Sequence, residues 1–227
     1  MKRFVAVFLA VILICGFSTI VAANIIVNPS FESWNMSWST PDFYNWNEVG
    51  DWGPTSGAHS GSMAVMLRDN AAYGSGEYAY SGLVSDKVGT LEYGTYEFGA
   101  WFQLKSNVDP TTVNNYDKPG VTMNVYWDAG GTIYPYVAYT FDNAPLTWTY
   151  AGSPYYGWLS DWIAIGGTFD VTQQVKNAEM NISIQNWSEY YSMVYVDDAF
   201  LQRVPEPASL LLLGVGLIGL AGFRRKE

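Results

Sequence analysis

Hydrophobic and polar residues alternate with a period of two along several short stretches of the chain. In Glu179–Gln185, the apolar residues Met180, Ile182 and Ile184 fall on one face, and polar residues fall on the other. The stretch Gly94–Leu104 alternates in the same way. A period of two is typical of a β-strand with one buried face. We found no long segment between the two chain ends with the 3.6-residue period of a helix.

Gly, Pro, Asn and Asp separate these stretches, so the pattern predicts many short strands. The predicted strands are residues 63–68, 94–104, 120–127, 134–141, 146–150, 162–169, 179–185 and 193–201. The sequence Asp-Ala-Gly-Gly at 128–131 predicts a hairpin turn. Half-buried strands at this spacing predict an all-β fold, an antiparallel β-sandwich of jelly-roll type.

The first 23 residues have the layout of a secretory signal peptide. Positive charges at Lys2 and Arg3 precede an apolar run, residues 4–20, and small residues follow at 21–23. We expect cleavage before Asn24. A retained membrane anchor is the alternative. Cys15 lies inside the apolar run and follows Ile14, which does not suit a lipoprotein signal, so we expect it to be removed with the peptide.

The last 24 residues form a second distinct segment, 204–227. Residues 208–223 are apolar and predict a transmembrane helix of about 24 Å, which is short for a membrane core of about 30 Å. Arg224, Arg225 and Lys226 follow it, which places that end on the cytoplasmic side. The segment between the two ends, residues 24–203, then corresponds to one domain of ordinary size.

Pro205-Glu206-Pro207, the apolar helix and the terminal Arg224-Arg225 pair together resemble the PEP-CTERM sorting signal. This resemblance implies that an exosortase-type protease of the inner membrane processes the protein. It also implies a Gram-negative bacterium that makes exopolysaccharide. The expected location is the cell surface or extracellular matrix, after transient anchoring in the inner membrane through the C-terminal helix.

Charge narrows the range of partners. The whole chain carries a net charge of −10, but five of its eleven basic residues lie in the two end segments. The central segment therefore has six basic and nineteen acidic residues. Because so acidic a surface repels phosphate backbones, we expect no nucleic-acid partner. The central segment has no cysteine, so no disulfide stabilises it.

Three stretches stand out for their acidic or turn residues, and the Asp pair in the last of them points to a cation. They are "NPSFE" at 28–32, "GAHSGSM" at 57–63 and "VDDAF" at 196–200. By alternation, either Asp197 or Asp198 is expected to face the apolar side, and a buried carboxylate is costly unless it is paired or binds metal. A hard cation such as Ca²⁺ would satisfy it. The alternative is that these acids accept backbone N–H groups of adjacent loops.

In this order, the three stretches resemble the galactose-binding-like jelly rolls found in many carbohydrate-binding modules. The resemblance implies a structural calcium ion that joins the first and last strands. Its ligands would be Glu32 and one of Asp197 and Asp198, with backbone carbonyls near the Ser-Gly turn. It also implies a polysaccharide partner.

Aromatic residues make up 17% of the chain, and all ten tryptophans lie in the central segment. Aromatic faces stack on sugar rings, and neighbouring polar groups bond the hydroxyls. Packing in the core of a β-sandwich is the alternative role. The candidates for carbohydrate binding, chosen for their loop-like surroundings, are Trp46, Trp52, Tyr155, Tyr156, Trp158, Trp187 and Tyr190.

Catalysis finds little support in the sequence, and we expect a protein that is not an enzyme. His59 is the only histidine, which excludes a zinc site built on several histidines. Its surroundings read Gly-Ala-His-Ser-Gly, not the G-x-S-x-G of a nucleophile elbow, so we expect a turn residue with local hydrogen bonds. A non-enzymatic glycan-binding protein is the leading interpretation. The alternatives are a purely structural matrix protein and a small polysaccharide hydrolase or lyase, which would need only two carboxylates.

Overall fold

A computed structural model describes residues 23–37, 40–68, 79–86, 88–106, 109, 112, 120–126, 134–140, 147–152, 157–172, 174–175, 178–186 and 192–205. The strands all belong to one compact unit, Asn24–Arg203. In the described part of the chain, no helix is long and apolar enough to cross a membrane. The predicted signal peptide (residues 1–22 of it) and the predicted helix 208–223 lie outside the described residues.

The larger of two sheets has seven antiparallel strands. They are β4 (Asp51–Thr55), β5 (Ala64–Arg68), β7 (Gly94–Ser106), β10 (Trp148–Tyr150), β11 (Trp158–Ser160), β12 (Ile163–Val171) and β14 (Ser192–Arg203). Their order is β10-β11-β7-β14-β5-β4, and β12 also pairs with β7. The long central strands β7 and β14 pair with each other, and they carry Trp101, Asp197 and Asp198 of the candidate site.

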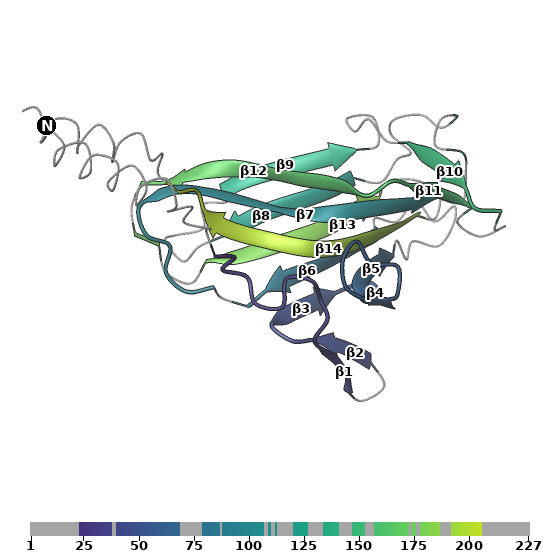
Figure 1. The fold of residues 1–227 in the computed structure, drawn as a ribbon, viewed down its shortest axis with the longest axis horizontal. Helices are drawn as coiled ribbons and strands as arrows, with labels where there is room; N and C mark the ends of the chain where they lie inside the picture. The colour runs from purple at the N-terminus through teal and green to yellow at the C-terminus, as the bar shows by residue number, and fades with distance from the viewer. Residues whose placement is uncertain are drawn as a thin grey trace, which may run out of the picture. The chain divides into compact units, whose positions relative to one another are not determined.

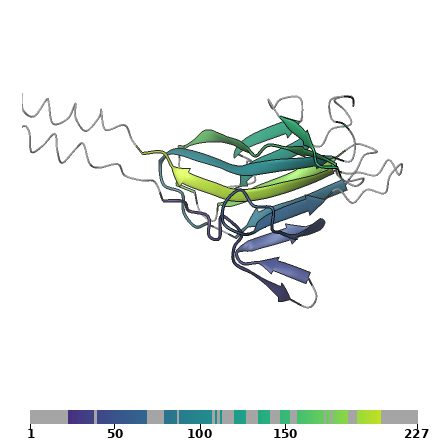
Figure 2. The ribbon, with the colours of Figure 1, turned by 45° about the vertical axis from the view of Figure 1, so that its right-hand side comes forward.

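The second sheet has five antiparallel strands in the order β3-β6-β13-β8-β9. These are β3 (Trp46–Val49), β6 (Ala79–Ser85), β8 (Gly120–Tyr126), β9 (Tyr134–Thr140) and β13 (Glu179–Asn186). A separate two-stranded hairpin joins β1 (Trp34–Ser37) to β2 (Thr40–Phe43). Figures 1 and 2 show the two larger sheets as stacked layers, with β7, β12 and β14 in one and β8, β9 and β13 in the other. The predicted all-β antiparallel sandwich is confirmed.

The core lies between the two layers and explains why the strands alternate. On β7, Tyr96, Phe98, Ala100, Phe102 and Leu104 are all buried, and the residues between them face the other way or are glycine. The predicted inward residues Met180 and Ile182 of β13 are fully buried on the opposite layer. The face of the seven-stranded sheet that points away from this core is called the outer face below.

Each of the predicted strands corresponds to a strand of the structure, with ends that differ by a few residues. The hairpin predicted at 128–131 lies outside the described residues, but the strands on either side of it, β8 and β9, pair antiparallel. The pattern did not predict β1, β2, β3, β4, β6 and β11. Most of these strands are short, and Trp, Asn, Gly and Pro interrupt their alternation.

Candidate functional site

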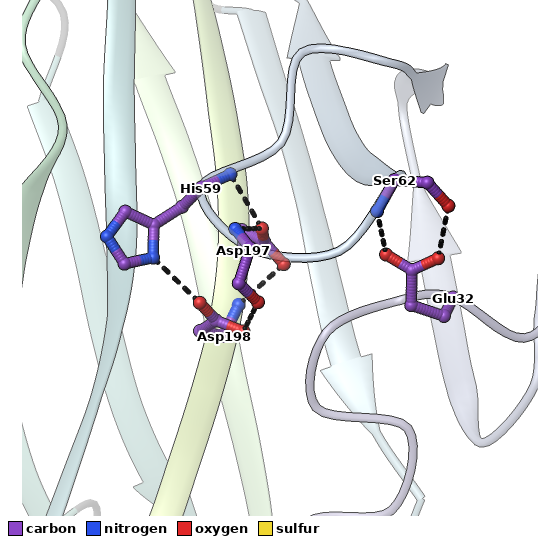
Figure 3. Close-up of polar contacts among 6 residues, drawn as sticks. Glu32, His59, Ser62, Asp197 and Asp198 are labelled. Atoms are coloured by element: carbon purple, nitrogen blue, oxygen red, sulfur yellow. Dashed lines mark hydrogen bonds and ion pairs between the residues drawn. The ribbon is translucent and has the colours of Figure 1, made fainter.

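Three carboxylates converge on one turn, residues 57–63, which joins β4 to β5 (Figure 3). The turn covers part of the outer face, since a Cβ added at Gly57 would lie 3.0 Å from the ring of Tyr195 on β14. Glu32 reaches the turn from the N-terminal segment, and Asp197 and Asp198 reach it from β14. Segments far apart in the sequence therefore meet at this turn.

Glu32 binds the end of the turn that enters β5. Its Oε1 accepts the backbone N–H groups of Ser62 at 2.6 Å and Met63 at 2.9 Å, and its Oε2 accepts the Ser62 hydroxyl at 2.7 Å. The bond from the Ser62 hydroxyl and these two backbone bonds lower the pKa of Glu32 below its usual range. The carboxylate is exposed, so it binds the turn in its charged form.

The loop before Glu32 fixes the position of this side chain. Asn28 has a left-handed φ of 53°, a conformation that Asn adopts more readily than most residues. Its side-chain amide donates to the carbonyls of Ser33 and Tyr44, and its Oδ1 accepts the Ser33 N–H. Phe31 is fully buried in the core. The buried Phe31 side chain and the hydrogen bonds of Asn28 together fix the backbone at Glu32.

Asp197 binds the middle of the turn and is fully buried. Its Oδ2 accepts the N–H groups of His59 at 2.8 Å and Ser60 at 2.9 Å, and its Oδ1 accepts the N–H of Asp198. Burial raises the pKa of Asp197, while the hydrogen bonds act in the opposite direction. The hydrogen bonds take the place of the cationic partner that a buried carboxylate otherwise needs.

Asp198 occupies a β-bulge, and this corrects the expectation from alternation. The pairing of β14 with β7 shifts between Asp197 and Phe200, and Asp198 has a left-handed φ of 46°. The extra residue of the bulge interrupts the alternation. Both carboxylates therefore contact the same turn on the outer face, and neither points into the core.

The side chain of His59 lies in a small aromatic cluster that the sequence did not predict. Its ring stacks on that of Trp101 with centroids 3.8 Å apart and planes 12° apart, and the ring of Trp162 lies edge-on at 5.6 Å. Its Nδ1 is 2.7 Å from Oδ2 of Asp198. The expectation of local hydrogen bonds was wrong, because the partner is 139 residues away in the sequence.

Ser60, His59 and Asp198 do not have the geometry of a catalytic triad. The Ser60 hydroxyl donates to Oδ1 of Asp198 at 2.7 Å, and His59 contacts the other oxygen of the same carboxylate. In a triad, the hydroxyl would bond to the imidazole, which acts as the base. The carboxylate here orients two neighbours of the turn rather than activating a nucleophile.

The acids accept backbone N–H groups of an adjacent loop, as the alternative to calcium predicted. Each carboxylate oxygen of Glu32, Asp197 and Asp198 already accepts at least one hydrogen bond. Within the described ranges, no group of three His, Cys, Asp or Glu side chains is placed to hold a metal ion. The hydrogen bonds satisfy these carboxylates without a cation, and the calcium ion stays a prediction.

The described carbohydrate-binding candidates lie in different places. Trp46 is 3% exposed, and its indole N–H donates to the carbonyl of Asn28, so core packing describes its role. Trp52 packs against the core beside Phe43. Trp158 is half-buried on β11. The candidates Tyr155, Tyr156, Trp187 and Tyr190 lie outside the described residues.

Trp158 and Tyr150 form an aromatic pair on the antiparallel strands β10 and β11. They are partners in the register, their ring centroids are 5.4 Å apart, and Tyr150 is 58% exposed. The connection between them contains Tyr155 and Tyr156. This hairpin therefore gathers three candidates and one additional exposed aromatic residue into one short stretch of chain.

Residues 203–226 match the family model of the PEP-CTERM protein-sorting motif. The chain thus carries this motif, which indicates an exported protein that an exosortase processes. β14 ends at Arg203, so the motif begins at the last residue of a central strand. Of the predicted sorting residues, Pro205 is exposed, and Glu206, Pro207, Arg224 and Arg225 lie outside the described residues.

The chain is also similar to solved structures. The carbohydrate-binding module TmCBM61 in complex with β-1,4-galactotriose is 18% identical, with 80% of this chain and 99% of that chain covered and a TM-score of 0.46. The CBM22-1 xylan-binding domain of Paenibacillus barcinonensis Xyn10C is 12% identical, with coverages of 78% and 92% and a TM-score of 0.42. The arabinose-bound MgGH51 α-L-arabinofuranosidase is 11% identical, with coverages of 82% and 27% and a TM-score of 0.49.

At these identities and TM-scores, the similarity to solved structures does not assign a function to this chain. A comparison with curated proteins finds no significant match.

Proposed function

We propose that this protein is exported, is processed at its sorting motif, and binds a polysaccharide of the cell surface or extracellular matrix without catalysing a reaction. The sorting motif at 203–226 supports export. The observation that carries the binding proposal is the Tyr150–Trp158 pair on the β10–β11 hairpin.

The hairpin suits a sugar ring for chemical reasons. Tyr150 is mostly exposed, although burying an aromatic side chain would contribute strongly to stability. A flat apolar face with a phenolic hydroxyl offers both the apolar and the polar contact that a saccharide takes. Tyr155 and Tyr156 in the same connection would add two further aromatic rings of this kind.

The second candidate function is that of a structural matrix protein without a specific ligand. The burial of Trp46 favours it, because that tryptophan serves the core. If the protein binds polysaccharide, replacing exposed aromatic residues should reduce its retention by a polysaccharide. If it is a structural protein without a ligand, these residues should have no such effect.

The test is affinity electrophoresis of the full-length chain in detergent through gels that contain galactan, mannan, xylan or a soluble cellulose derivative. Each gel is run with calcium and with a chelator. We expect retardation in at least one gel, and we expect Trp158→Ala and Tyr150→Ala to reduce it. Tyr93→Ala is the matched control, because Tyr93 is 61% exposed and lies before β7. No retardation in any gel would favour the structural protein.

The same gels and melting curves test the calcium prediction. If a chelator lowers the melting temperature, an ion stabilises the fold. If a chelator changes retardation without changing the melting temperature, the ion acts at the binding site. Equal results in both conditions would remove calcium from the proposal.

A further inference from the structure

The aromatic cluster of His59, Trp101 and Trp162 lies on the outer face of the seven-stranded sheet. Trp162 follows Trp158 by only four residues, but Trp158 pairs with the buried Ser106 of β7, which is in phase with the core residues of that strand. The Tyr150–Trp158 pair therefore faces the opposite side of the sheet from Trp101.

The neighbours of Trp101 on β7, Ala100 and Phe102, are fully buried, so Trp101 points away from the core. Trp101 and Trp162 are only partly buried, and the His59 side chain is 28% exposed. The core does not require these rings, and each comes from a different segment of the chain.

The strand beside Trp101 presents small side chains on this face. Ala164 of β12 is the partner of Trp101 in the register, and Gly166 is the partner of Gly99. Both Ala164 and Gly166 are exposed. Because residues paired across antiparallel strands point to the same face, no large side chain of β12 covers Trp101 from that side.

Phe200 extends the apolar surface on the β14 side. It is the register partner of Gly99, and a Cβ added at Gly99 would lie 2.6 Å from Cζ of Phe200. The ring therefore lies across Gly99, next to the position of Trp101, and Phe200 is itself only partly buried. Aromatic rings thus follow one another on this face, with small residues beside them.

The cluster is held in place before any ligand arrives. Oδ2 of Asp198 lies 2.7 Å from Nδ1 of His59, which fixes the ring and makes Nε2 the nitrogen that can contact a ligand. Asp197 holds the backbone N–H of the same residue. A side chain that is already ordered loses less conformational entropy when it binds a ligand.

We propose that Trp101, Trp162 and His59 form a second carbohydrate-contacting surface, which takes an uncharged hexose unit on the outer face. The rings supply the apolar contact, and Nε2 of His59 forms a hydrogen bond with a sugar hydroxyl.

On the central strands β7 and β14, Glu97 and Asp198 place two carboxylates on this face, against the single ammonium of Lys105, which donates to the Tyr195 hydroxyl. The excess of negative charge disfavours an anionic sugar. This inference rests on the proposed function and adds a separate site to it.

The test measures retardation of the full-length chain in the same polysaccharide gels, with two variants that act differently. Trp101→Ala removes the central ring. Ala164→Lys leaves every ring in place and adds a long side chain at the exposed partner position of Trp101. Thr168→Lys is the matched control, since it adds the same charge on the same exposed face of β12, four residues away. Melting curves check that each variant is folded.

We expect Trp101→Ala and Ala164→Lys to weaken binding of a neutral polysaccharide about tenfold, and Thr168→Lys to leave it unchanged. Binding by Ala164→Lys at the wild-type level would overturn the second surface. Loss in Trp158→Ala together with full binding by Ala164→Lys would overturn only this inference and leave the proposed function standing. Binding of polyuronates but of no neutral polymer would overturn the ligand class.

Discussion

Gly61 is the residue of the turn that leaves space for the Glu32 carboxylate. Its φ is +64°, and a Cβ there would lie 2.2 Å from Oε1 of Glu32. We expect Gly61→Ala to lower the free energy of unfolding by more than the ~1–2 kcal/mol that left-handed backbone alone costs. Gly152→Ala is the matched control, with φ +76° and nothing within 4 Å of the added Cβ.

Urea denaturation of both variants separates backbone strain from the clash. In the double variant Gly61→Ala with Glu32→Ala, the clash is absent, so the two effects should not add. Equal destabilisation by Gly61→Ala and Gly152→Ala would show that the Glu32 carboxylate does not lie against Gly61.

Glu32 makes the stability of the turn depend on pH. Its pKa is lowered in the folded state, so its contribution is present above pH 4.5, the usual value, and is lost as pH falls through the lowered pKa. We expect Glu32→Gln to destabilise the protein at pH 7 and to differ less from wild type below pH 4.5. Chemical denaturation across a pH range of about 3 to 7 measures the difference.

Glu92→Gln is a suitable control in this series, because the Glu92 carboxylate accepts the side-chain amide of Gln174 and no backbone N–H of the turn.

The contribution of Asp197 to stability depends on pH with the opposite sign to that of Glu32. Burial raises its pKa, so it stabilises the fold most when protonated, and this contribution falls as pH rises through its pKa. For Glu32, the contradicting result would be a loss of stability in Glu32→Gln, relative to wild type, that grows as the pH falls. The hydrogen bonds of the Glu32 carboxylate to Ser62 and Met63 would then not stabilise the fold.

The residues of the site show which contacts a sequence can reveal. The Asp pair is expected to need a partner because it lies in an apolar strand, and Glu32 is added only by the resemblance to carbohydrate-binding modules. The structure brings all three to one turn. The stack of His59 on Trp101 could not be predicted in this way. It depends on how the turn 57–63 folds over β7, and no local pattern encodes that distance.

At the scale of the strand, the bulge in β14 depends on the type of residue at position 198. Asp and Asn adopt left-handed φ more easily than Ala. We expect Asp198→Ala to cost about 2 kcal/mol, because it adds backbone strain and removes the bonds to His59 and Ser60. Asp198→Asn should cost less than about 1 kcal/mol, since Asn keeps the backbone preference and one acceptor.

The same pair of substitutions at Asp170 is the control for this prediction. Asp170 lies on the regular edge strand β12, where its carboxylate accepts the Thr95 hydroxyl. There, Ala and Asn should have similar small effects when urea denaturation is compared. If Ala and Asn were also equivalent at position 198, the backbone there would not be left-handed.

The strands that the sequence predicted and those that it missed differ in length and composition. β7, β13 and β14 are long and place apolar residues at every second position for most of their length. β3 and β4 have the sequences WNEV and DWGPT, in which one or two apolar residues give no period. They form because β6 and β5 provide edges with which they pair, which is a tertiary effect.

At the scale of the whole molecule, two properties affect which ligands can bind. The sandwich determines which side chains are exposed, and the acidic composition determines the charge that a ligand meets. The core residues of both sheets form one cluster, which fixes the strands and leaves polar and aromatic side chains on the outer face. The central segment carries nineteen acidic and six basic residues. An excess of one sign creates a field around the whole protein, which acts on any charged polymer that approaches.

This field predicts opposite salt responses for two classes of polysaccharide. Binding of a neutral polymer should change little between about 0.01 and 0.15 M NaCl, because stacking and hydrogen bonds to hydroxyls are short-range. Binding of a polyuronate should be weak at low salt and should strengthen as salt screens the repulsion between like charges. Affinity electrophoresis at both salt concentrations, with a chelator present to prevent calcium bridges, gives the comparison. Polyuronate binding that weakens with salt would require a basic surface and would exclude the proposed specificity for neutral sugars.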